Sequence, residues 1–226
     1  MKRKGTEFPT INQFFFIKTR KSKIIYFFIA LTVVLSLRML ENALHEFSHA
    51  SVVFFVGGAL RENPFLITPF GGYTRWQDVP LTWLPLVNIA GTLFSTIVMI
   101  SIFVPIFIHS KNKLVRWTAY WGGFVIPVNA LFYWLIPPFI ADAMHFDPVA
   151  FAVNLNIEPT WIIGVVTMIP FSFLLYFLYY STNRLNHEIL QDKSLFHLKC
   201  LVFYYAISMF FPTISYLNLL DQFKWW

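Results

Sequence analysis

Residues 45–49 read His-Glu-Phe-Ser-His, a spacing of side chains that suits a divalent metal ion. On a helix, positions i and i+4 lie on one face, so His45 and His49 can hold one ion together. Glu46 is then placed to take a proton from a metal-bound water. Because a catalytic zinc ion usually has three protein ligands and one open position, the motif predicts two ligands and the general base of a zinc hydrolase.

This motif lies in a stretch of chain that is apolar enough to cross a bilayer. The 226 residues are 57% hydrophobic, 20% aromatic and 12% charged, whereas soluble domains carry roughly 25% charged residues. Ionisable clusters are costly to bury in lipid and usually have a function there. The composition therefore predicts an all-α polytopic membrane protein with its chemistry within or at the edge of the membrane.

Apolar segments divide the chain into about five to six predicted transmembrane helices. The first occupies residues 24–59, and a mixed segment near 62–78, rich in β-forming residues, predicts a short β-hairpin or an extended loop. Residues 1–23 are a basic segment, 24–220 a single transmembrane metalloprotease domain and 221–226 a short tail. Four further apolar segments are each long enough to span the bilayer: residues 86–108, 117–140, 159–181 and 198–220.

The distribution of charge predicts the orientation of these segments. Seven of the 17 Lys and Arg residues lie in residues 1–23, which predicts a cytoplasmic N-terminus. The positive net charge is therefore not evidence that the protein binds nucleic acid. The loop 111–116 is also basic, whereas 141–158 contains acidic residues and no Lys or Arg. The basic loop is expected in the cytoplasm and the acidic loop outside, and both expectations are met if residues 24–59 cross the membrane once. His45, ~32 Å along a helix from Ile24, then lies on the side of the acidic loop.

The acidic loop 141–158 contains the candidates for the third metal ligand. Asp142 and Asp147 are aspartates at a membrane boundary on the expected side, and His145 lies between them. A single cysteine, Cys200, excludes a metal site built from cysteines and an internal disulfide. The sequence therefore predicts one zinc ion per chain, held by two histidines and one residue of this loop.

Two further groups are candidates for substrate binding. Gly71 and Gly72 permit a close backbone approach, so the predicted hairpin either offers a strand edge to an unwound substrate or anchors at the membrane surface through Tyr73, Trp76 and Trp83. Asn129, inside the segment 117–140, is expected to tie two helices together or to donate a hydrogen bond to a substrate carbonyl.

In their order along the chain, these elements resemble the site-2 protease family of membrane-embedded zinc metalloproteases. After the His-Glu-Phe-Ser-His motif, Pro69-Phe70-Gly71-Gly72 is similar to the Pro-x-Gly-Gly element of the family. Asn88-Ile89-Ala90-Gly91-Thr92 looks like a degraded Ala-Gly-Pro-x-x-Asn helix, with Thr92 and Ser95 at the proline and asparagine positions. Phe146-Asp147-Pro148-Val149-Ala150 resembles the segment that supplies the third ligand in compact members.

The resemblance covers about residues 40–160. It implies an intramembrane protease that binds zinc through His45, His49 and Asp147 rather than Asp142, and that acts on a membrane-protein or peptide substrate. An Asn-Pro-Asp-Gly element is missing from these 226 residues, and we expect no regulation by PDZ or CBS modules. We expect a multi-pass protein of a prokaryotic cell membrane.

Two other functions are compatible with the motif. A non-catalytic membrane protein could retain the metal site for structure, sensing or transport, which the altered Ala-Gly-Thr element favours. Membrane peptidases that trim prenylated proteins use a later Glu-x-x-x-Asp segment, a spacing that Glu188 and Asp192 reproduce. This segment is expected on the cytoplasmic side, and the Pro-x-Gly-Gly element would remain unexplained.

Overall fold

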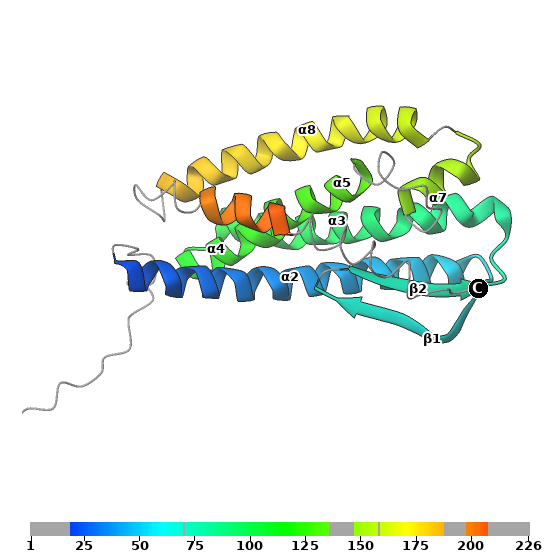
Figure 1. Cartoon of the computed structure of the whole chain (residues 1–226), viewed down its shortest axis with the longest axis horizontal. Coiled ribbons are helices and arrows are strands. Elements are labelled where there is room, and N and C mark those ends of the chain that lie inside the picture. Colours follow the sequence, from blue (N-terminus) through cyan, green and yellow to red (C-terminus); the bar gives the residue numbers. More distant parts are fainter. Residues whose placement is uncertain (1–18, 70, 136–146, 158, 188–197, 208–226) are drawn as a thin grey trace, which may run out of the picture.

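The protein is mostly helical, with one small sheet (Figure 1). The computed structural model describes residues 19–69, 71–135, 147–157, 159–187 and 198–207. In chain order the elements are α2 (Arg20–Phe55), β1 (Ala59–Thr68), β2 (Gly71–Gln77), α3 (Leu84–His109), α4 (Lys113–Tyr120), α5 (Ile126–Leu135), α7 (Asp147–Asn154), α8 (Pro159–Leu185) and the helix Leu198–Ile207. A 3-10 turn, Leu81–Trp83, precedes α3, and a π-helical turn, Trp121–Val125, joins α4 to α5.

Helix α2 is continuous over 36 residues, a length of about 54 Å. It begins at Arg20, before the apolar sequence, because Thr19 and Ser22 form a reciprocal capping box: the Thr19 hydroxyl accepts from the Ser22 N–H at 3.1 Å, and the Ser22 hydroxyl from the Thr19 N–H at 3.0 Å. It ends where Gly57 adopts a φ of 82°, as glycine permits. The first apolar segment is thus one long helix, which Gly57 and Gly58 follow.

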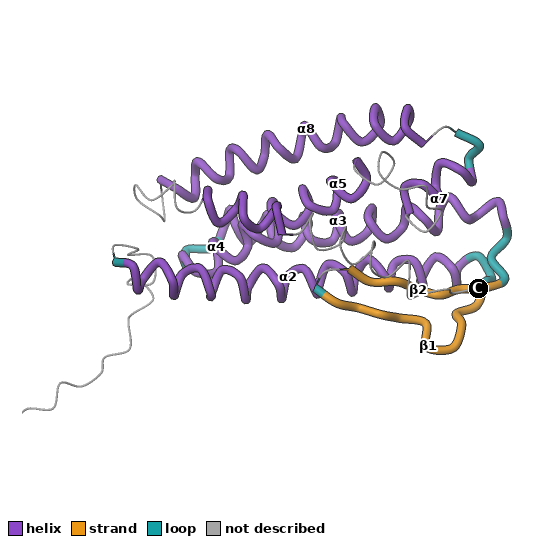
Figure 2. The backbone as a smooth tube through the Cα atoms, viewed as in Figure 1, coloured by secondary structure: helices purple, strands orange, loops and turns teal. Residues whose placement is uncertain are grey.

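The predicted hairpin is present and lies along the C-terminal half of α2 (Figure 2). β1 and β2 pair antiparallel, with Phe65 opposite Thr74 and Thr68 opposite Gly71. The side-chain amide of Asn42 donates to the carbonyl oxygen of Thr68 at 2.6 Å. This bond fixes the tip of the hairpin to the middle of α2.

Helix α3 packs antiparallel against α2, and α5 and α8 complete the bundle (Figures 1 and 2). The largest buried side chains of the bundle include Tyr26 of α2 and Trp117 of α4. The indole N–H of Trp117 donates to the Tyr26 hydroxyl at 2.8 Å. At Gly122, in the π-helical turn, a Cβ would lie 2.7 Å from the ring of Phe103. The glycine therefore lets this turn approach α3 closely.

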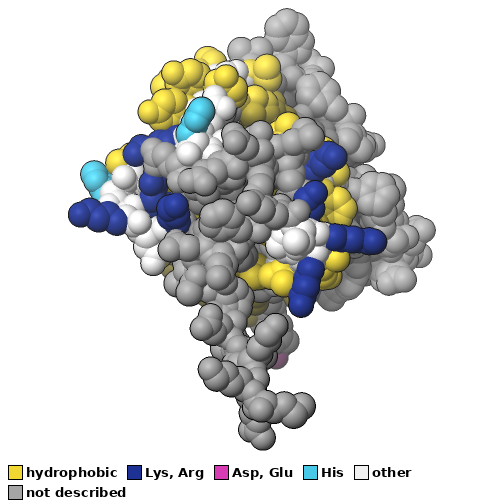
Figure 3. All heavy atoms as spheres, turned by 90° about the vertical axis from the view of Figure 1, so that its left-hand side faces the viewer, with side chains coloured by type: hydrophobic (Ala, Val, Ile, Leu, Met, Phe, Trp, Pro, Cys, Tyr) yellow, Lys and Arg dark blue, Asp and Glu magenta, His cyan; other side chains and the backbone are white. Residues whose placement is uncertain are grey.

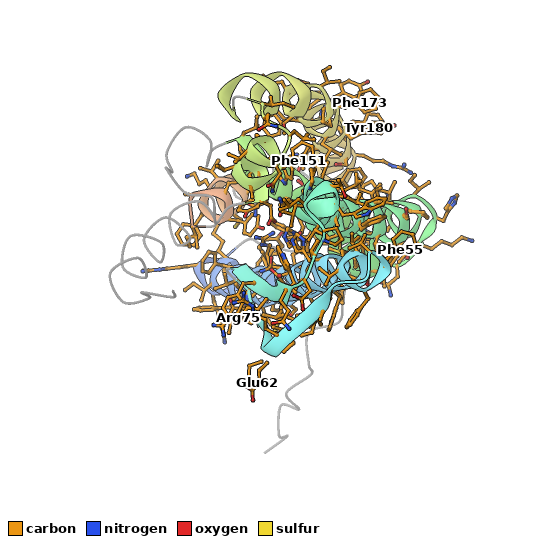
Figure 4. All side chains as sticks on the ribbon, turned by 90° about the vertical axis from the view of Figure 1, so that its right-hand side faces the viewer. Phe55, Glu62, Arg75, Phe151, Phe173 and Tyr180 are labelled. Carbon is orange, nitrogen blue, oxygen red and sulfur yellow. The ribbon has the colours of Figure 1, made fainter. Side chains whose placement is uncertain are left out.

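Two of the described helices, α2 and Leu81–His109, are long and apolar enough to cross a membrane. The larger number of crossings expected from the sequence stays a prediction. Large apolar side chains are exposed on several helices, and Figure 4 shows Phe55 of α2 and Phe173 and Tyr180 of α8 on the outside of the bundle.

Basic residues gather at the end of the bundle where α2 begins, which Figure 3 shows face on. The Trp117–Tyr26 hydrogen bond brings the start of α4 to this end, and a 2.7 Å bond between the hydroxyls of Tyr120 and Thr182 brings the end of α8 there. The basic residues of these three segments are Arg20, Lys21, Lys23, Lys111, Lys113, Arg116 and Arg184.

Candidate metal centre

Three potential ligand atoms meet where α2 and α7 come together beside α3. The Nε2 of His45 lies 2.9 Å from the Oδ2 of Asp147, and the Nε2 of His49 lies 3.3 Å from the same oxygen. The two Nε2 atoms are 3.0 Å apart. His49 is buried, and the other two are partly buried. Within the described part of the chain this is the one group of three such residues with converging ligand atoms.

The group consists of residues that the sequence analysis proposed as metal ligands. His45 and Asp147 are 102 residues apart in the chain. Asp147, the preferred aspartate, lies against both histidines. Asp142 and His145 are outside the described residues, as are Glu188 and Asp192 of the alternative peptidase hypothesis.

The distances and the donor atoms fit a zinc ion. Four ligands at ~2.0–2.1 Å in a tetrahedron lie ~3.3 Å from one another, close to the 2.9–3.3 Å between these three atoms. Two imidazoles and a carboxylate are donors that zinc accepts. These three atoms can therefore occupy three corners of a tetrahedron with little movement of the side chains.

A glycine on α3 keeps space open beside the two imidazoles. A Cβ at Gly91 would lie 2.4 Å from the Nε2 of His49 and 2.5 Å from the Nε2 of His45. These distances are far shorter than ordinary van der Waals contacts. Gly91 is therefore part of the site, a role that the sequence did not reveal beyond its place in a motif.

The carbonyl oxygen of Val87 orients His49. It lies 2.6 Å from Nδ1 of His49, and because a carbonyl only accepts, Nδ1 carries the proton. In the neutral ring the lone pair is then on Nε2, the atom that faces His45 and Asp147. The ring of Trp76 on β2 lies over His49, with 5.7 Å between ring centroids.

Asp147 is the first residue of α7, and Tyr133 of α5 fixes its backbone. The Asp147 N–H donates to the Tyr133 hydroxyl at 3.3 Å. Burial by itself would raise the pKa of the Asp147 carboxyl, but His49 and His45 in their protonated, positively charged form outweigh it and hold that pKa below its ordinary value when no metal is bound. The carboxyl is therefore ionised at neutral pH, the form that binds metals.

Glu46 is buried between α2 and the hairpin. The Thr74 hydroxyl lies 2.7 Å from its Oε2 and 3.0 Å from its backbone carbonyl oxygen. A Cβ at Gly72 would lie 2.8 Å from its Oε1, so the backbone of β2 passes directly against the carboxylate. The carboxylate is close enough to interact electrostatically with both histidines and Asp147.

The other two predicted substrate-binding residues lie apart from this contact. Gly71 closes the hairpin, where the Thr68 hydroxyl donates to its carbonyl oxygen at 2.7 Å, and a Cβ there would have no neighbour within 4 Å. Asn129 is buried on α5 and is engaged in an interaction. Their part in substrate binding stays a prediction.

The residues of α3 that resemble an altered Ala-Gly-Pro-x-x-Asn motif have defined contacts. Thr92, at the proline position of the motif, accepts a hydrogen bond from the indole of Trp134 at 2.6 Å. Ser95, at the asparagine position, donates to Glu41 at 3.0 Å, and Glu41 pairs with Arg38. Thr92 and Ser95 thus join α3 to neighbouring helices near the ligand group.

No family model, curated protein or solved structure matches this chain.

Proposed function

We propose that this chain is a membrane-embedded zinc metalloprotease similar to the site-2 protease family. His45, His49 and Asp147 hold the zinc ion, and Glu46 is the general base. The convergence of the three ligand atoms beside Glu46, on a helix apolar enough to cross a membrane, carries this proposal. A chance polar motif would not bring an aspartate from a distant helix to within 3.3 Å of both histidines.

Three features support a multi-pass membrane protein with this site near one boundary. Two helices have the length and hydropathy of a span, and apolar side chains face outward on α2, α3 and α8. Basic residues gather at the end where α2 starts, as expected of a cytoplasmic face. His45 lies 25 residues beyond Arg20, about 38 Å along the helix, against a hydrocarbon core of ~30 Å. The site then lies at the outer edge of the bilayer.

The chain's own residues have separate tasks in peptide hydrolysis. A zinc ion bound by this group supplies Lewis-acid chemistry, which polarises a carbonyl and makes water acidic near neutral pH. Glu46 accepts a proton from the water that attacks the carbonyl carbon, and passes it to the leaving amine as the C–N bond breaks. Thr74 holds the Glu46 carboxylate in place for both transfers.

β2 is the element best placed to hold the substrate. An extended segment that adds to this strand by backbone hydrogen bonds would run past Gly72 and Glu46. A peptide must be extended for this contact, so we expect cleavage where a substrate helix is unwound. The second hypothesis for the hairpin, an anchor at the membrane surface, rests on the exposed Tyr73 and Trp83.

Substitution of Glu46 by Gln tests the mechanism, because the amide keeps the shape of the side chain and cannot accept the proton. We would measure zinc per chain and the cleavage of an unfolded protein, casein, and of labelled single-span peptides in lipid nanodiscs. We expect stoichiometric zinc in both proteins and a loss of cleavage of at least about 10³-fold in Glu46→Gln. Cleavage by Glu46→Gln at the wild-type rate would refute Glu46 as the base. Stoichiometric zinc without Glu46-dependent cleavage would instead support a non-catalytic metal protein.

A further inference from the structure

Asn88 on α3 is a buried polar residue whose amide nitrogen has no hydrogen-bond partner. Its side chain is 3% exposed, and its Nδ2 makes no hydrogen bond. An unpaired buried donor costs about 1–3 kcal/mol, and native proteins contain few of them. On the same helix, Thr92 and Ser95 are both hydrogen-bonded. The fold therefore keeps a buried N–H donor at position 88 that makes no hydrogen bond within the described residues.

Asn88 lies within one helical turn of two residues that contact the ligand group. Val87, the preceding residue, orients His49 through its carbonyl oxygen, and Gly91, one turn later, lies against both imidazoles. Cβ atoms three residues apart on a helix are ~5–6 Å from each other. The Cβ of Asn88 is thus ~5–6 Å from the position that a Cβ of Gly91 would take, next to the Nε2 atoms of His45 and His49. The side-chain N–H of Asn88 is within reach of a substrate group held there.

We propose that Asn88 donates a hydrogen bond to the carbonyl oxygen of the peptide bond being cleaved. This assignment rests on the proposed protease function and adds a catalytic residue to it. As the water oxygen bonds to the carbonyl carbon, the π electron pair moves onto the carbonyl oxygen and Glu46 takes the water proton. Asn88 transfers no proton in this step. Its N–H stabilises the growing negative charge, for which a donor fixed in advance and kept from water is most effective.

Asn129, which the sequence suggested for such a contact, is less suited, because this residue is already engaged in an interaction. Asn42 is also committed, through its bond to Thr68. Asn88 combines burial, an unused donor and a position next to the ligands.

The test compares Asn88→Leu and Asn88→Ala with a matched control, Thr96→Val, in the full chain in nanodiscs. Thr96 carries a second unpartnered buried polar atom on α3, five residues beyond Gly91. We expect both Asn88 variants to keep stoichiometric zinc and a melting temperature no lower than that of the Thr96 variant. Their kcat should fall on the order of 10²-fold, with KM within about threefold, since the contact strengthens only as charge develops. Thr96→Val should keep the wild-type kcat.

A peptide phosphinate, a stable tetrahedral anion, provides a second measurement. Its affinity should fall across the Asn88 variants by the same factor as kcat/KM, which a purely structural role would not produce. The inference is wrong if Asn88→Leu keeps a kcat within threefold of wild type, or if either variant loses zinc together with activity. Both outcomes require a wild-type protein that cleaves its substrate in a Glu46-dependent way. If the protease proposal itself is wrong, that wild-type cleavage is missing, so the two failures can be told apart.

Discussion

Substitution of Gly91 by alanine is the sharpest structural test of the proposed metal centre. The new methyl carbon would lie 2.4–2.6 Å from atoms of His49 and His45, whereas non-bonded carbon contacts are normally ~3.5–4.0 Å. Either the imidazoles or α3 must move by about 1 Å. Metal binding tolerates a change of only ~0.2 Å in the metal–ligand distances. A movement of α3 instead would cost about 1–3 kcal/mol in packing. We expect the histidines to move, because the methyl group occupies the space beside their ligand atoms.

The expected result is a loss of zinc affinity of at least about 10²-fold, comparable with or larger than the effect of changing a residue that supports a ligand. Zinc per chain and competition with a chelator measure this loss directly. A chelator should also lower the melting temperature of the wild type, since a metal that binds only the folded state stabilises it. In Gly91→Ala that decrease should disappear.

Gly122→Ala is the matched control for overpacking. A Cβ at Gly122 would also be too close, at 2.7 Å from the ring of Phe103, but Gly122 lies in the π-helical turn of the hydrophobic core. We expect Gly122→Ala to lower the melting temperature and to keep stoichiometric zinc. If Gly91→Ala also bound zinc with wild-type affinity, the assignment of the metal to the space beside Gly91 would be refuted.

Two further predictions concern the third ligand and the base. Asp147→Ala should abolish stoichiometric zinc binding while Asp142→Ala keeps it, as elemental analysis of the purified proteins can measure; the reverse pattern would move the ligand to Asp142. Thr74→Val should lower kcat about tenfold with zinc retained, because it removes the hydroxyl that fixes the Glu46 carboxylate, and Thr74→Ser should restore most of the rate. An unchanged kcat in Thr74→Val would show that the base needs no such support.

The sequence predicted what depends on local periodicity and on charge. His45, Glu46 and His49 follow from helical spacing within five residues, and the distribution of Lys and Arg indicated that the loop containing Asp147 lies on their side. The hairpin follows from β-forming residues and from the glycines of its turn. The number of membrane crossings stays a prediction.

Gly91 and Ser95 could not be identified in the same way. A glycine inside an apolar helix indicates only a weak helix former, and its proximity to two imidazoles depends on how α3 packs on α2. Ser95 in place of an asparagine suggested a degraded motif. Its hydroxyl nevertheless has a partner, Glu41, that is 54 residues away in the chain. Such roles depend on long-range packing, which one sequence does not determine.

The hydrogen bonds along α2 give a physical reason for the arrangement of the whole site. An apolar helix can carry several polar residues in a membrane only if each has a partner, because lipid supplies none. The partners of four of them come from two sources: α3 binds Glu41 and His49, and the hairpin binds Asn42 and Glu46. The contacts that allow these side chains to be buried are thus the ones that would fix the proposed ligands and the proposed base in place before a metal or substrate binds. On α3, the buried amide nitrogen of Asn88 has no such partner, and a substrate carbonyl bound as we propose would supply one.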